Sequence, residues 1–189
     1  MTPIFTIHAG EYLVGSFIEK TFKNLNVWIP SKDTGIDLLV TNTSNKRTAS
    51  YQVKFSKDFT PDLSDAIQSG LSVCGWWTLS TKKIAESTAD YWVFINRSLN
   101  RKKQHFVVIK PSTLLKRLTD LYGTAKTLQH YFWIDNQNNC WATRGLKKQE
   151  LLLIAKGAYS NPARDFTKHL DNWSVLERMS VQKQRKGDS

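Results

Sequence analysis

The chain has 189 residues, of which 40% are hydrophobic and 12% aromatic, so it can bury a core and is not a disordered protein. Lys and Arg outnumber Asp and Glu by 27 to 16, and the net charge of +11 favours a polyanionic partner such as nucleic acid. A basic surface that confers only solubility is the alternative reading.

Other features narrow the class of protein further. Cys74 and Cys140 are the only cysteines, and their separation fits neither a disulfide framework nor a zinc motif. No apolar run approaches the roughly 20 residues that span a bilayer, and the first residues lack the pattern of a signal peptide. We therefore expect a cytoplasmic protein without a membrane partner.

The first part of the chain predicts one helix and three strands. Residues 9–24 are expected to form an amphipathic helix, because Val14 and Ile18 recur on one face. Three strands are predicted at 26–30, 35–42 and 49–56, and the polar stretch between the last two suits a hairpin.

The rest of the chain predicts a further series of helices and strands. They are a helix at 64–73, strands at 90–95 and 105–110, a helix at 111–123, a hairpin at 130–145 and a closing helix at 160–179. This order is typical of an α/β protein with a mixed central sheet flanked by helices and a C-terminal hairpin and helix elaboration. We expect a core over 1–125, the hairpin and helix packed on it over 126–178, and a basic tail over 179–189.

Two polar residues stand out in the strand at 49–56. Side chains alternate along a strand, so Tyr51, Val53 and Phe55 share an apolar face that should meet the core. Gln52 and Lys54 must then lie on the opposite face. The strand therefore carries an amide and an amine away from the core.

Two carboxylates are expected at the same place. In the neighbouring strand Ile36 and Leu38 match the apolar face, which puts Asp37 on the side of Gln52 and Lys54. Glu11 lies three residues before Val14 and seven before Ile18, so it shares the inward side of the first helix. The alternatives are that Glu11 only caps its helix and that Asp37 and Lys54 form an ordinary cross-strand pair.

Such a set of groups suits phosphate chemistry with a hard divalent cation. Glu11, Asp37 and the backbone carbonyl of Val53 can supply oxygen ligands, and water and phosphate complete the shell. A lysine beside a scissile phosphate can orient the attacking water and offset the charge of the transition state.

These residues resemble the PD-(D/E)XK nuclease superfamily, whose restriction-endonuclease-like core carries a helical Glu, then an Asp, then an acid-x-Lys on the next strand. The matching positions are Glu11, Asp37 and Gln52-Val53-Lys54. "GID" at 35–37 and "QVK" at 52–54 look like the motifs of Mrr-type restriction nucleases, archaeal Holliday junction resolvases and transposase endonuclease subunits. The resemblance covers roughly the first 95 residues.

The resemblance implies a Mg²⁺-dependent DNA endonuclease that hydrolyses phosphodiester bonds, in which Mn²⁺ substitutes for Mg²⁺ and two copies form a homodimer. Glu11 and Asp37 would bind the metal, Gln52 would support the metal or its water, and Lys54 would assist the attacking water. The sequence departs from the family pattern at Gln52, where an acid is usual, and at Ile36, where proline is usual.

Basic and aromatic residues near the motif are further candidates for contact with DNA. Trp76 and Trp77 could stack on bases, although tryptophans in such a chain more often belong to a core or an interface. The predicted phosphate contacts are Lys57, Arg97, Arg101, Lys102 and Lys103. A solvated turn between two strands explains most of this run equally well.

Two other functions compete with catalysis. A nuclease-like fold that binds nucleic acid without cutting it is the first, and the neutral Gln52 favours it. The second is a scaffold without a nucleic-acid partner, in which Asp37 and Lys54 merely pair.

Overall fold

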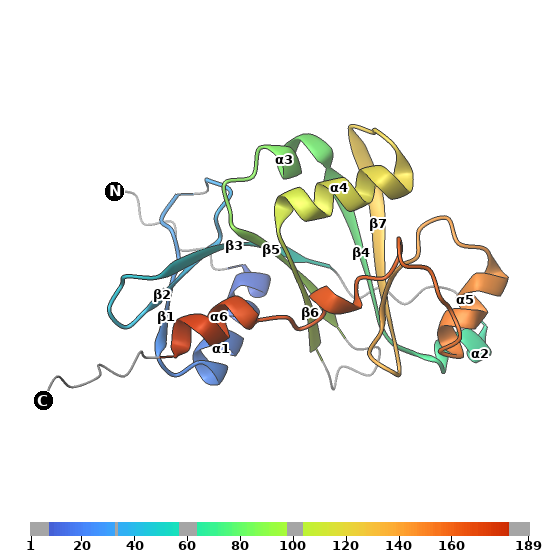
Figure 1. Ribbon diagram of the computed structural model, residues 1–189, viewed down its shortest axis with the longest axis horizontal. Coiled ribbons are helices and arrows are strands. Elements are labelled where there is room, and N and C mark those ends of the chain that lie inside the picture. The colour runs from blue at the N-terminus through green and yellow to red at the C-terminus, as the bar shows by residue number, and fades with distance from the viewer. Residues whose placement is uncertain (1–7, 33, 57–63, 98–103, 182–189) are drawn as a thin grey trace, which may run out of the picture.

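The computed structural model describes residues 8–32, 34–56, 64–97 and 104–181. It is a mixed α/β protein with a five-stranded mixed sheet and a three-stranded antiparallel sheet, and the described residues form six α-helices (Figure 1). The elements are α1 (Ala9–Thr21), β1 (Leu25–Trp28), β2 (Leu38–Asn42), β3 (Thr48–Phe55), α2 (Asp65–Gln68), β4 (Leu71–Ser80), α3 (Thr81–Ala85), β5 (Tyr91–Arg97), β6 (Gln104–Ile109), α4 (Pro111–Tyr122), β7 (Thr127–Asp135), β8 (Cys140–Ala142), α5 (Lys148–Ala155), a 3₁₀ turn (Thr167–His169) and α6 (Ser174–Ser180).

The five-stranded sheet has the order β1-β2-β3-β5-β6. Its first three strands are antiparallel neighbours, β5 runs parallel to β3, and β6 returns antiparallel to β5. Parallel neighbours need a crossover connection. Here the chain between β3 and β5 passes through α2, β4 and α3 before it returns to the sheet.

The three-stranded sheet has the order β4-β7-β8 and corrects one prediction. Residues 64–73 are not one helix, because α2 ends at Gln68 and β4 begins at Leu71. Gly70 lies so close to α5 that an added Cβ would be 2.1 Å from the carbonyl oxygen of Ala155. The long antiparallel pairing of β4 with β7 then outweighs the helical spacing of the apolar residues.

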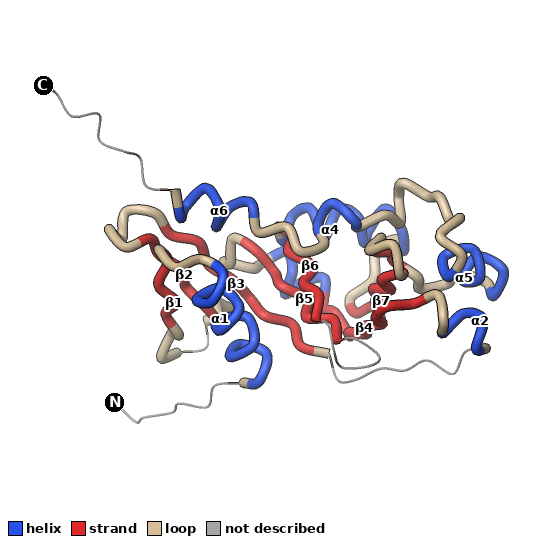
Figure 2. The backbone as a smooth tube through the Cα atoms, turned by 90° about the horizontal axis from the view of Figure 1, so that it is seen from below, coloured by secondary structure: helices blue, strands red, loops and turns tan. Residues whose placement is uncertain are grey.

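Two helices cover one face of the five-stranded sheet. α1 and α6 meet there, and the rings of Phe17 and Trp173 are 5.3 Å apart. Figures 1 and 2 show α1 and α6 beside the β1–β3 part of the molecule and α2 with α5 at its other end. The opposite face of β5 and β6 packs against α3, α4 and the second sheet, with Trp92, Phe94 and Phe132 among the buried side chains.

The closing segment differs from its prediction. Residues 160–179 do not form one long helix, because only the 3₁₀ turn and α6 are helical there. Between them Asp171 adopts a positive φ of 48° and exchanges hydrogen bonds with Phe106 of β6. This fixed irregular turn anchors the segment to the sheet edge.

The boundaries of other predictions also shift. The sequence pattern does not predict α3 and α5. The predicted core of residues 1–125 ends before β7, but β7 pairs with β4, which lies inside that core. The predicted tail overlaps α6 as far as Ser180, and its last residues, 182–189, lie outside the described part. None of the described helices has the length and apolar character needed to cross a bilayer.

Candidate active site

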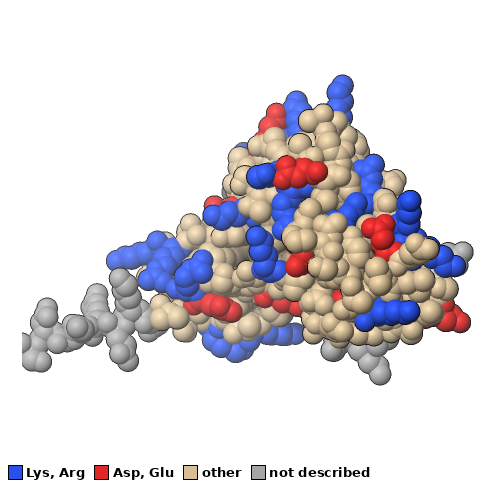
Figure 3. Space-filling view, turned by 45° about the vertical axis from the view of Figure 1, so that its right-hand side comes forward, with Lys and Arg blue, Asp and Glu red and all other residues tan. Residues whose placement is uncertain are grey.

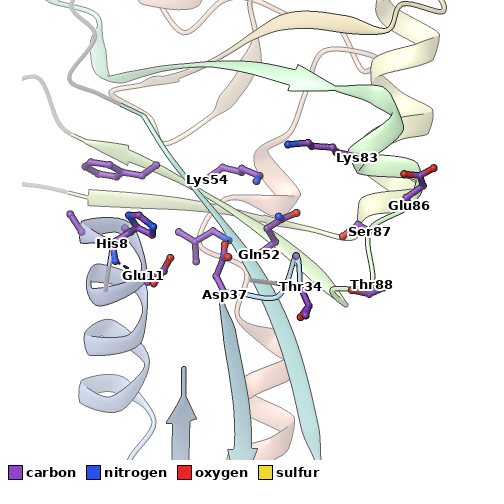
Figure 4. A pocket seen from close by; sticks show the side chains of 15 residues that line it. His8, Glu11, Thr34, Asp37, Gln52, Lys54, Lys83, Glu86, Ser87 and Thr88 are labelled. Carbon is purple, nitrogen blue, oxygen red and sulfur yellow. Dashed lines mark hydrogen bonds between the residues drawn. The ribbon is translucent and has the colours of Figure 1, made fainter. Parts of the chain in front are cut away.

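A cavity of about 690 Å³ lies where the N-terminal turn of α1 meets β3 (Figure 4). All five residues of the sequence motif line it: Glu11, Asp37, Gln52, Val53 and Lys54. The structure therefore brings together groups from α1, from the residue before β2 and from β3.

The cavity exists because β3 extends beyond its neighbour. β2 begins at Leu38, opposite Tyr51, so Gln52 to Phe55 continue without a β2 partner. Asp37 takes the place of that partner: its backbone N–H donates to the carbonyl of Tyr51 at 2.8 Å, and its Oδ2 accepts from the N–H of Val53 at 2.6 Å. The N–H and C=O of one strand residue point to the same side, so the Val53 carbonyl also points toward Asp37.

Gly10 allows the helix to approach the strand this closely. A Cβ at Gly10 would lie 2.9 Å from Cβ of Phe55 and 3.2 Å from Cγ1 of Val53. The first turn of α1 thus packs directly on β3 and carries Glu11 to the cavity. Figure 4 shows the Glu11 and Asp37 side chains turned toward the same space.

Glu11 also has the capping role that was the alternative reading. Its Oε2 accepts from the backbone N–H of His8 at 3.3 Å. Capping holds the carboxylate at the start of the helix, and that end faces the cavity. The capping contact therefore leaves Glu11 at the cavity, where it lines the wall.

Lys54 is held by aromatic residues that are distant in sequence. Its Nζ lies 4.7 Å from the ring centroid of Trp92, in cation–π geometry. The indole N–H of Trp77 donates to the backbone carbonyl of Lys54 at 3.2 Å, and that of Trp92 donates to Oγ of Ser87 at 2.8 Å. Both the backbone and the ammonium group of Lys54 are thereby positioned.

The prediction of which residues of β3 face the core is partly correct. Tyr51 is buried and Val53 half-buried, whereas Phe55 is 37% exposed at the end of β3, so the expectation that it faces the core is wrong. Ile36 packs with the core around Trp92 rather than with Leu38, because β2 has not yet begun at residue 36.

The two adjacent tryptophans of β4 lie on opposite faces of the strand, one buried and one exposed. Trp77 is buried edge-on to Phe94 at 5.1 Å, which confirms the core reading for this residue. Trp76 points to the opposite face and is 39% exposed.

Of the predicted phosphate contacts, the structure describes only Arg97. Arg97 ends β5 and is half-buried, but it is not one of the lining residues. The other four, Lys57, Arg101, Lys102 and Lys103, lie outside the described residues.

Sequence reasoning missed the side of the cavity that α3 forms. Lys83 of α3 and the residues that follow the helix, Glu86, Ser87 and Thr88, line it there. His8 and Thr34 line it elsewhere. The only signal was the pair of lysines in "TKKIAEST" between two predicted strands, and it carried no motif.

The donors at the cavity fit a hard divalent cation. The carboxylates of Glu11 and Asp37, the Val53 carbonyl and the Gln52 side-chain oxygen are all oxygen donors, which Mg²⁺ prefers, and waters commonly complete its shell. In the described part of the chain no three or more His, Cys, Asp and Glu residues group together as a metal cluster. An ion at this cavity would therefore depend on backbone, amide and water oxygens besides the two acids.

Comparisons with protein families, with characterised proteins and with solved structures found no match for this chain. The residues of the cavity are therefore the basis on which a function is assigned.

Proposed function

We propose that this chain is a divalent-metal-dependent DNA endonuclease with a restriction-endonuclease-like fold. The observation that carries the proposal is that Glu11, Asp37, Gln52, Val53 and Lys54 line one cavity. These five positions are those through which the sequence resembles the PD-(D/E)XK superfamily.

The arrangement of elements supports the same proposal. A helix is followed by three antiparallel strands, and a crossover leads to a strand parallel to the third. The two motif segments are neighbours in this sheet, and α1 brings the glutamate to their shared end. That is the placement on which the resemblance depends.

Each residue then has a role that its position allows. Glu11 and Asp37 would hold the metal with the carbonyl of Val53, and the bound metal would polarise the phosphoryl oxygen and lower the pKa of water. Asp37 is fixed by the N–H of Val53, so its carboxylate needs little reorganisation. Lys54, held over Trp92, orients water and balances the charge that develops on phosphate.

A catalytically inactive DNA-binding protein is the second candidate function. The observation that favours it is Gln52, because an amide oxygen binds a divalent cation more weakly than the acid usual at this position. Such a protein would retain the basic surface and the cavity but leave DNA intact.

Plasmid nicking in Mg²⁺ or Mn²⁺ tests the proposal. Asp37→Asn retains an acceptor for the Val53 N–H but removes the charge, and Lys54→Met retains most of the length of the side chain but removes its charge. We expect each to lower the rate at least about 100-fold, since each removes a charged group of the site. Asp120→Asn and Lys116→Met, an exposed ion pair on α4, are the matched controls and should cut at the wild-type rate.

The outcomes separate the two candidates. Equal rates in wild type, Asp37→Asn and Lys54→Met would refute the assignment of these residues. A wild-type protein that retards DNA in a gel but never cuts it would establish the inactive binding protein. The mass of the protein in solution tests the homodimer implied by the family resemblance.

A further inference from the structure

Two adjacent lysines of α3 have different surroundings. Nζ of Lys82 pairs with Oε1 of Glu86 at 3.9 Å, and both side chains are largely exposed. Lys83 lines the cavity instead, and it forms no ion pair with any described residue. Figure 4 shows Lys83 extending from α3 toward Lys54. Glu86 also lines the cavity, but it is the partner of Lys82.

α3 is held firmly enough to place Lys83. Oγ of Ser80 accepts from the backbone N–H of Lys83 at 3.3 Å, and Oγ1 of Thr81 donates to the carbonyl of Ala125 at 2.6 Å. Ile84, the residue after Lys83, is 1% exposed and belongs to the core beneath. The backbone of Lys83 is therefore fixed, and only its side chain is free to adapt to a ligand.

The cavity consequently has two chemically different sides. Glu11 and Asp37 form an acidic side next to α1. On the other side Lys54 and Lys83 bring ammonium groups from β3 and α3, and the carboxylate of Glu86 there is paired with Lys82. A nucleic acid backbone matches this division, because its phosphates are anionic and bind lysine ammonium groups.

We propose that Lys83 binds a backbone phosphate of the nucleic acid held in the cavity and so adds a second cationic contact to that of Lys54. The inference deepens the proposed nuclease function, since it assigns a further substrate-binding residue to the same cavity. Lys82, one residue away, pairs with Glu86 and is not one of the lining residues, so it makes no such contact.

Binding to a duplex oligonucleotide in EDTA, measured over a range of salt concentrations, tests this without any cleavage. Each phosphate contact contributes about 0.9 to the slope of log K against log[salt]. Lys83→Ala should lower the magnitude of the slope by about 0.9 and weaken binding about tenfold near 50 mM salt. Lys82→Ala should change the slope much less, and a thermal melt of each variant verifies that it is folded.

The results separate this inference from the nuclease proposal. If the wild type binds DNA without cutting it and Lys83→Ala alone lowers the slope, the inference stands and catalysis fails. If the wild type cuts DNA but Lys83→Ala and Lys82→Ala have the same slope and KM, the inference is overturned and the nuclease stands. A wild type that does not bind DNA overturns the inference as well.

Discussion

The ammonium group of Lys54 depends on residues far from its own motif. Trp92 lies beneath it, and Trp77 binds its backbone carbonyl. A cation–π contact is worth about 0.5–2 kcal/mol, enough to favour one orientation of a long flexible side chain. The motif predicts which residues meet at the cavity, but not these supports, because they come from strands that the local pattern does not connect.

His130 is a buried residue whose protonation affects stability. Its ring is fully buried, edge-on to Phe132 at 4.3 Å, and burial, with the nearby Arg144 and Arg164, lowers its pKa to about 3. Burial likewise lowers the pKa of His169, to about 4, aided by Lys168 and Arg117. Both histidines are therefore neutral in the folded protein near pH 5.

These shifts predict a loss of stability in acid. The unfolded chain binds protons on both histidines below about pH 6.5. In the folded chain His169 binds a proton only near pH 4 and His130 only near pH 3. Their stabilising effect is complete above pH 6.5 and is lost as the pH falls from there toward 3. For each extra proton that the unfolded chain binds, the free energy of unfolding falls by about 1.4 kcal/mol per pH unit as the pH is lowered.

Urea unfolding of His130→Phe and His130→Leu at several pH values measures this effect. Between pH 6 and 4 the free energy of unfolding of either variant should fall about 1.4 kcal/mol per pH unit less steeply than that of wild type. Two variants are used because phenylalanine and leucine fill the site differently, but neither side chain can bind a proton. Wild-type steepness in both would show that His130 does not carry the effect.

At the scale of elements, the contact between α1 and β3 determines the geometry of the site. Gly10 and Gly15 are both buried glycines of α1, but an added Cβ at Gly15 would meet only Cγ1 of Val27, at 3.5 Å. At Gly10 the same atom would lie 2.9 Å from Phe55. Alanine in place of glycine stabilises a helix by about 1 kcal/mol. The packing around the added Cβ therefore decides whether each substitution raises or lowers the free energy of unfolding.

Gly10→Ala should therefore lower the free energy of unfolding by about 1–3 kcal/mol through overpacking, and it should displace Glu11 from the cavity. Gly15→Ala should leave stability unchanged or raise it by up to about 1 kcal/mol. Denaturant unfolding measures both, and plasmid nicking reports the displacement of Glu11. If the two variants are equally stable and equally active, close packing at Gly10 does not determine the site.

The elements that periodicity predicts are those whose local pattern agrees with their packing. α1, β3, β5 and β6 lie close to the expected ranges. β4 does not, because its tendency to form a strand is realised only by pairing with β7, whose paired residues lie 47 to 64 positions further along the chain. The closing segment also fails, since Asp171 bonds to Phe106 of β6 instead of continuing a helix.

At the scale of the whole molecule, one core joins the two sheets. Trp77 of β4, Phe94 of β5 and Phe132 of β7 pack edge-on with ring centroids 5.1–5.8 Å apart. Figure 3 shows Lys and Arg side chains spread over one face, with fewer Asp and Glu among them, in keeping with the net charge of +11. The core is shared between the sheets, so folding should be cooperative across the predicted boundary at residue 125.

Truncation at that boundary tests the shared core. A chain of residues 1–125 lacks β7, so β4 loses its partner and Trp77 loses Phe132. We expect it to show no cooperative urea transition, whereas residues 1–181 should unfold in one step with a midpoint close to that of the full chain. A cooperative transition in the shorter chain would establish 1–125 as an independent domain.

The bond from the Trp77 indole to the Lys54 carbonyl has a consequence for how such a protein can change over time. Substitutions inside the smaller sheet can shift the tilt of that indole and so move the backbone of Lys54 without altering any residue that lines the cavity. Diversification of the proposed nuclease activity would then appear as substitutions in the interior of β4 and β7, while the residues of the cavity wall stay the same.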